Sequence, residues 1–109
     1  MAVTEIDIDQ FAEVLTAGAR VIDVREPDEY EAGHVPGAVL IPLGTVPEHL
    51  DAFLGDGPTY VICQAGGRSR RACELVDAGG LDGVRTVNVA GGTGAWIASG
   101  RETVVGDQP

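Results

Sequence analysis

The sequence lacks lysine altogether, and its seven arginines stand against seventeen aspartates and glutamates, for a formal net charge of −10. A protein that holds nucleic acid by its phosphates needs a basic surface, so this composition argues against nucleic-acid binding. Only two cysteines occur, ten positions apart, and they form neither a CxxC pair nor a Cys/His zinc spacing. We therefore expect no disulfide framework, no metal site and no cofactor.

Long apolar segments are also missing. No run approaches the roughly 20 apolar residues that a membrane span requires. Glu5, Asp7 and Asp9 interrupt the region where a signal peptide would be apolar. We expect a soluble, cytoplasmic protein with no membrane partner. Its 109 residues, 44% of them hydrophobic, fit one domain, for which a monomer is the default state.

The arginines are unevenly placed along the chain. Residues 63–73 contain three arginines and no acidic residue, so this segment carries +3 while the rest of the chain carries −13. We expect the local cluster, including Arg70 and Arg71, to retain anions near residue 63. The acidic remainder should repel the same anions at low salt.

Short apolar runs alternate with amphipathic segments, and glycine or proline marks each change, which is typical of an α/β domain with a mostly parallel sheet. Strands are expected at 21–24, 38–41, 59–62 and 86–89. Helices are expected from a capping box at Asp7 and Gln10 to Gly18, at 26–33, from a capping box at Thr45 to Leu54, at 69–78, and in a last turn or helix that carries Trp96.

The candidate site lies between the strand at 59–62 and the helix at 69–78. Cys63 stands at the carboxyl end of a buried strand, where ligand sites of parallel sheets occur. Gly66 and Gly67 let the following loop curl with its N–H groups converging, and the next helix adds the positive end of its dipole. Such a cradle binds an anion. Together with Arg68 it is expected to lower the pKa of the Cys63 thiol.

Three segments, in this order, are similar to signatures of the rhodanese family of sulfurtransferases. They are residues 21–26 (Val-Ile-Asp-Val-Arg-Glu) with Glu29-Tyr30 soon after and then 33–38 (Gly-His-Val-Pro-Gly-Ala), the loop 63–69, and 89–92 leading to Trp96. The resemblance covers residues 4–103, which are expected to form one rhodanese-like domain. It implies a three-layer fold with helices on both faces of the sheet. Residues 104–109 are expected to be a short flexible tail.

The resemblance implies that Cys63 attacks the outer sulfur of an anionic donor, thiosulfate or a persulfide, and carries it as a persulfide to an acceptor: a thiol, cyanide or another protein. Substrate binding is expected from the loop residues Gln64, Ala65, Gly66, Gly67, Arg68 and Ser69. The Arg68 side chain is the best candidate for recognising the donor's charge. Asp23 and Arg25 are expected to brace loops near the site, and His34 to pin a loop through a hydrogen bond.

Other functions stay open. Phosphatases and arsenate reductases of this fold have a histidine before the cysteine and five residues between cysteine and arginine. Here Ile62 precedes Cys63, and four residues separate it from Arg68. The shorter loop favours sulfur chemistry. The family often has a basic residue at the position of Gln64, so this residue favours a donor other than thiosulfate.

A second alternative is a rhodanese module that delivers or senses sulfur, or docks a partner through the acidic segment 26–31. The other conspicuous residues have simpler explanations. We expect Cys73 to be buried in preference to serving as a resolving thiol, and Trp96 to lie in the core. Gly91 and Gly92 either line the pocket or form a plain turn.

Overall fold

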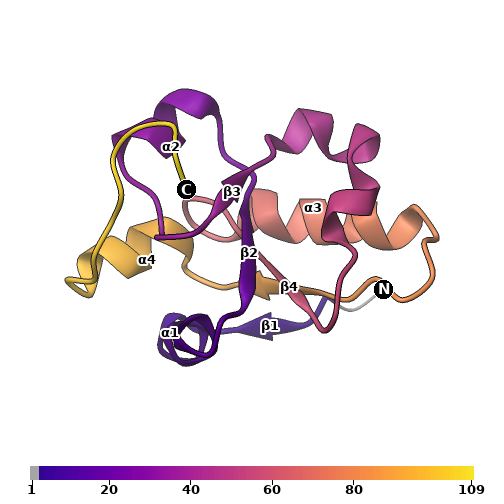
Figure 1. The fold of residues 1–109 in the computed structure, drawn as a ribbon, viewed down its shortest axis with the longest axis horizontal. Coiled ribbons are helices and arrows are strands. Elements are labelled where there is room, and N and C mark those ends of the chain that lie inside the picture. The colour runs from indigo at the N-terminus through magenta and orange to yellow at the C-terminus, as the bar shows by residue number, and fades with distance from the viewer. Residues whose placement is uncertain (1–2) are drawn as a thin grey trace.

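A five-stranded parallel sheet forms the centre of the computed structural model, which describes residues 3–109 (Figure 1). The strands are β1 (Glu5–Ile6), β2 (Arg20–Asp23), β3 (Val39–Leu40), β4 (Thr59–Ile62) and β5 (Thr86–Val89), and their order across the sheet is β1-β5-β4-β2-β3. All four neighbouring pairs run parallel. Because β4 is the central strand, the residue that follows it, Cys63, lies in the middle of the carboxyl edge.

Helices cover both faces of this sheet, which confirms the expected three-layer α/β fold. They are α1 (Ile8–Thr16), α2 (Pro27–Ala32), α3 (Gly67–Ala78) and α4 (Gly92–Ala98), with two 3₁₀ helices, η1 (Leu43–Glu48) and η2 (Leu50–Phe53), between β3 and β4. In Figure 1, α1 and α4 lie to the left of β2, and α3 lies to its right.

The period-two alternation of the strands separates two cores. Successive side chains of a strand point to opposite faces, so Val21 of β2 packs with Phe11 and Trp96, whereas Ile22 packs with Val76 and the other apolar residues beneath α3. The prediction that Trp96 belongs to the core is confirmed. The two cores pack against the two faces of the sheet, and the packed sheet positions the loop after β4.

The helix boundaries follow the sequence signals in some places and not in others. The capping box of Asp7 and Gln10 is present at the start of α1. The helix predicted from Thr45 to Leu54 is wrong, because the segment forms η1 and η2 instead. Pro47 lies inside η1 and has no N–H to donate, and the Thr45 hydroxyl donates to the carbonyl of Pro42 without capping a helix.

The segment 104–109, expected to be a flexible tail, lies along the domain in this structure. Val104 and His34 form an isolated antiparallel bridge, and the N–H of Gly106 donates to the carbonyl of Glu31. Its flexibility and the boundary of the domain at residue 103 stay predictions. No helix within residues 3–109 is long and apolar enough to cross a membrane.

Candidate active site

The loop after β4 wraps around the sulfur of Cys63. Cys63 is only 1% exposed, and the N–H of Gly66 donates to its Sγ at 3.1 Å. Gly66 adopts a φ of +110°, a conformation that residues with a Cβ rarely enter. Helix α3 begins at Gly67, two residues before the predicted start, so its first turn is part of the loop. The N–H groups of a first helical turn have no partners within the helix and favour an anion.

The thiol of Cys63 is tuned toward its anionic form. Burial raises the pKa of Cys63, but the hydroxyl of Ser69 and the N–H groups of Ser69, Gly66 and Ala65 outweigh this effect. The pKa of the thiol therefore lies below its ordinary value of 9.0. A lowered pKa enlarges the fraction of thiolate, which is the nucleophilic form of cysteine, at neutral pH.

Ser69 and Asn88 form a buried polar chain behind the sulfur. The single proton of the Ser69 hydroxyl has more than one acceptor within reach, including Cys63 Sγ at 3.3 Å and Asn88 Oδ1, and it is donated to one of them at a time. The Asn88 amide is fixed, because its Nδ2 donates to Glu5 Oε2 at 2.7 Å and to the carbonyl of Gly66 at 3.1 Å. Asn88 thus braces both the loop backbone and the hydroxyl that faces the sulfur. Asn88 was not among the predicted site residues, because only the pairing of the strands in the sheet brings it to the loop.

Replacing Ser69 by alanine should raise the pKa of Cys63, because one donor to the thiolate is lost. The loss of one such hydrogen bond corresponds to about three- to tenfold slower alkylation of Cys63 by iodoacetamide at pH 7. Alkylation rates measured against pH in a Cys73→Ser background would check this. The half-maximal rate should move to higher pH in the variant, and an unchanged profile would show that Ser69 does not act on the sulfur.

Asp23 and Arg25 form a buried ion pair beside the loop. Arg25 Nη2 lies 2.9 Å from Asp23 Oδ2, and the two side chains are 3% and 0% exposed. Arg25 also donates to the carbonyl of Gly33 at 3.0 Å and to Gln64 Oε1 at 3.2 Å. The pair therefore connects the end of β2, the end of α2 and the first residue after Cys63.

Arg68, the residue expected to recognise the donor, contacts a carboxylate of the protein itself. Its Nη1 and Nη2 lie 2.6 and 2.8 Å from Oε1 and Oε2 of Glu29 in α2. The hydrogen bond from Arg68 is the main reason that the pKa of Glu29 falls to about 2 from 4.5. Because the pKa is lowered on folding, the pair stabilises the fold above about pH 4.5. This contribution is lost as the pH falls toward about 2.

The other two arginines of the 63–73 cluster are also paired. Arg70 Nη1 lies 3.1 Å from Glu5 Oε2, and Arg71 Nη1 lies 3.6 Å from Glu74 Oε1. Each arginine of the cluster therefore has a carboxylate partner, and the retention of anions by the cluster stays a prediction. The charges along the sequence did not predict these three ion pairs, because their carboxylates come from β1, α2 and the next turn of α3.

The loop before α4 braces the Cys63 loop through backbone contacts. The N–H of Thr93 donates to the carbonyl of Cys63 at 2.8 Å, and that of Gly94 donates to the carbonyl of Gln64 at 3.0 Å. A Cβ on Gly92 would lie 2.5 Å from the carbonyl oxygen of Cys63. Gly92 therefore packs directly against the Cys63 loop, and its expected place in the wall of the pocket stays a prediction. Gly92 allows two backbones to meet.

His34 is fully buried and stacks on Tyr30, with ring centroids 3.6 Å apart. Its two ring nitrogens lie 2.7 Å from the carbonyl oxygens of Tyr30 and Gln108. These contacts join α2 to the segment 104–109, so the structure places His34 beside that segment and none of these contacts reaches the Cys63 loop.

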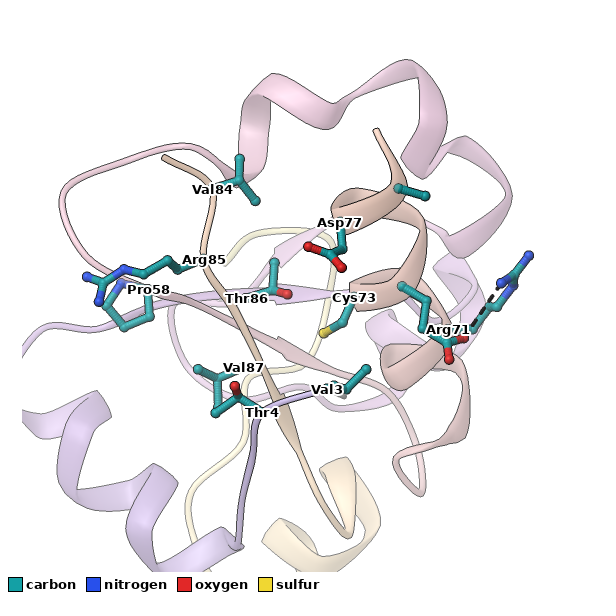
Figure 2. Close-up of a pocket in the computed structure, with 12 residues that line it drawn as sticks. Val3, Thr4, Pro58, Arg71, Cys73, Asp77, Val84, Arg85, Thr86 and Val87 are labelled. Atoms are coloured by element: carbon teal, nitrogen blue, oxygen red, sulfur yellow. Dashed lines mark ion pairs between the residues drawn. The ribbon is translucent and has the colours of Figure 1, made fainter. Parts of the chain in front are cut away.

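A separate cavity lies near the amino ends of β4 and β5, away from the carboxyl ends of the strands where Cys63 lies. This cavity has a volume of about 700 Å³. Among the residues that line it, Figure 2 shows the thiol of Cys73 beside Thr86, with Asp77, Arg85 and Val87 around them. Cys73 is 2% exposed, which confirms its predicted burial. Burial raises the pKa of Cys73 above its ordinary value, whereas at Cys63 the hydrogen bonds outweigh burial and the pKa is lowered. The residues that line this cavity include none of the Cys63 loop, so it does not belong to the same site.

The observed parts define a class: a parallel α/β domain with one activated cysteine in a short anion-binding loop. The model of the Rhodanese-like domain family matches residues 7–99, and the chain belongs to this family.

Two curated relatives come from Bacillus subtilis (strain 168). A putative sulfurtransferase, YtwF, is 37% identical over 98 residues, which cover 88% of this chain and 92% of that protein. A putative sulfur carrier protein, YrkF, is 33% identical over 97 residues, which cover 87% of this chain and 51% of the relative. Among solved structures, the human single-domain sulfurtransferase TSTD1 has a TM-score of 0.73 and 30% identity, with 90% of this chain and 97% of that chain covered.

Proposed function

We propose that this protein moves a sulfane sulfur from an anionic donor, thiosulfate or a persulfide, to a thiol, cyanide or protein acceptor through a persulfide on Cys63. One observation carries the proposal: a buried thiol of lowered pKa receives hydrogen bonds from Gly66 and Ser69 inside a loop too short for the related phosphatases. The family and its relatives named sulfurtransferase support sulfurtransferase activity in general. The expected setting is the cytoplasm, where thiols stay reduced.

In the first half-reaction, the Cys63 thiolate attacks the outer sulfur of the donor. A bond forms between Sγ and this sulfur, the S–S bond of the donor breaks, and the leaving group departs with the electron pair as sulfite or a thiolate. The new terminal sulfur is itself an anion at neutral pH. The N–H groups at the start of α3 stabilise this charge without having to move.

In the second half-reaction, the acceptor attacks the terminal sulfur of the persulfide. The S–S bond to Cys63 breaks, and Sγ regains its electron pair as a thiolate. Gly66 and Ser69 stabilise the departing thiolate by the same hydrogen bonds that lower the pKa of Cys63. No resident metal or cofactor takes part in either step.

Steady-state kinetics with varied donor and varied cyanide test the proposal. Because the donor's leaving group departs before the acceptor attacks, double-reciprocal plots should give parallel lines. Intersecting lines would contradict a persulfide intermediate. A module that only delivers sulfur to a dedicated protein would complete the first half-reaction and leave cyanide unconverted, so the amount of thiocyanate formed after the first turnover separates this alternative.

A further inference from the structure

The side chains at the rim of the Cys63 loop already have partners within the protein. Both terminal nitrogens of Arg68 contact the carboxylate of Glu29, and Arg25 contacts Asp23, Gly33 and Gln64. Gln64 itself is uncharged, and a Cβ on Gly94 would lie 3.1 Å from its Nε2, so its amide lies between Arg25 and α4. A donor at the loop therefore meets no cation without a carboxylate partner among these residues.

The pair of Arg68 and Glu29 is the one that controls the charge next to the sulfur. Arg68 lies in the first turn of α3, next to the loop that holds Cys63, and its pKa is raised mainly by Glu29 and to a lesser extent by the Cys63 thiolate. Glu29 stays ionised throughout the neutral range, because its pKa is about 2. The pair is 38% and 31% exposed, so water and a donor can reach it, but its net charge is zero.

The possible donors differ most in the charge they bring to the thiolate. Thiosulfate is a dianion and releases sulfite, which holds two charges when it leaves unprotonated. A persulfide, R–S–S⁻, brings one charge on its reacting sulfurs and releases a single thiolate, R–S⁻, as Cys63 becomes Cys63–S–S⁻, so two negative charges share the loop. Crowding three negative charges at one loop requires a nearby cation without a partner, whereas the persulfide reaction does not.

We infer that Glu29 is a specificity-determining residue that neutralises Arg68 and so makes the site selective for persulfides over dianionic thiosulfate. This inference rests on the proposed sulfurtransferase function and specifies its donor. It also assigns a role to one acid of the segment 26–31. This segment is the candidate docking surface named above, and Glu29 within it contacts Arg68 at the Cys63 loop directly.

The variant Glu29→Gln tests the inference, with thiosulfate and cysteine persulfide as the two donors. A glutamine keeps an Oε1 that can accept the N–H of Glu26, so the capping contact of α2 is retained. The substitution leaves the charge of Arg68 uncompensated. One unit charge about 6 Å from the donor, at an effective dielectric constant of about 40, changes binding by about tenfold. The same charge acts on both charges of thiosulfate, so we expect kcat/KM for thiosulfate to rise by about 100-fold, that for cysteine persulfide by no more than about tenfold, and the ratio of the two by about tenfold or more.

Two further variants separate this mechanism from a general change of surface charge. Glu31→Gln removes the same charge from the same helix, at an exposed residue that makes no ion pair within residues 3–109, and should leave the ratio of the two kcat/KM values unchanged. The double variant Glu29→Gln/Arg68→Gln should lose the gain with thiosulfate, because the cation that causes it is absent.

The inference is overturned if Glu29→Gln leaves the thiosulfate rate unchanged, if the gain persists in the double variant, or if Glu31→Gln gives the same gain. It is also overturned if the unmodified protein already uses thiosulfate as well as cysteine persulfide. If the unmodified protein transfers sulfur from neither donor, the proposed function itself fails. These results are distinguishable because persulfide formation on Cys63 is measured separately with each donor.

Discussion

Replacing Gly92 by alanine is expected to slow sulfur uptake by Cys63 by about 100-fold, because a displacement of about 1 Å at a reacting group costs this much. The new Cβ would lie 2.5 Å from the carbonyl oxygen of Cys63 and 2.7 Å from the carbonyl oxygen of Gln64. Both neighbours are backbone atoms, so the clash can be relieved only by moving the catalytic loop away from α4. That movement would break the hydrogen bonds that Thr93 and Gly94 donate to the loop.

Gly100→Ala is the matched control for this variant. Gly92 and Gly100 have φ values of +60° and +78°, so alanine is strained at both positions, but a Cβ on Gly100 meets no atom within 4 Å. Stopped-flow measurement of thiolate release from cysteine persulfide would separate the two effects. Both variants should lose stability, and only Gly92→Ala should lose activity. Equal losses of activity would show that strain, and not contact with the loop, is responsible.

Asp23→Ala is expected to lower the free energy of unfolding by about 3–5 kcal/mol, because breaking a buried ion pair leaves the other charge without compensation. Asp23 is fully buried, and its carboxylate accepts hydrogen bonds from the Nε and Nη2 of Arg25 as well as from the Arg25 backbone. Urea denaturation followed by circular dichroism measures the loss. The residual activity should also fall, because Arg25 contacts Gln64 directly.

Asp9→Ala provides the comparison for an exposed pair. Asp9 is 82% exposed and lies 3.1 Å from Arg101, so its loss should cost less than about 1 kcal/mol. If Asp23→Ala were no more destabilising than Asp9→Ala, the pair of Asp23 and Arg25 would not be the brace that its burial indicates.

Patterns within a few neighbouring residues predicted those helices and strands that carry a clear local signal. Apolar runs marked β2, β4 and β5, and the capping box of Asp7 and Gln10 marked the start of α1. Strand β1 was not predicted, because two residues carry no periodicity and its partner β5 lies about 80 residues away in the chain. The segment around Pro47 was misread because the capping signal at Thr45 is common to short turns and long helices.

The centre of the candidate site was predictable, but its surroundings were not. Gly66 and Gly67 after a strand-end cysteine identified the loop, because few other functions require that pattern. The partners of the loop come from distant elements: Glu29 from α2, Asn88 from β5, and Gly92 from the start of α4. Contacts between residues that lie far apart in the sequence cannot be predicted from local patterns, and each of these contacts affects the chemistry expected at Cys63. Pairing with Glu29 changes it most, since it turns the expected donor-binding arginine into half of a neutral pair.

The central claim is that Cys63 carries the transferred sulfur. Intact mass spectrometry after incubation with cysteine persulfide tests it most directly, using the unmodified protein, Cys63→Ser and Cys73→Ser. We predict that the mass of the unmodified protein and of Cys73→Ser increases by one sulfur atom that cyanide removes, and that the mass of Cys63→Ser does not change. A cyanide-labile sulfur that remains on Cys63→Ser would contradict it.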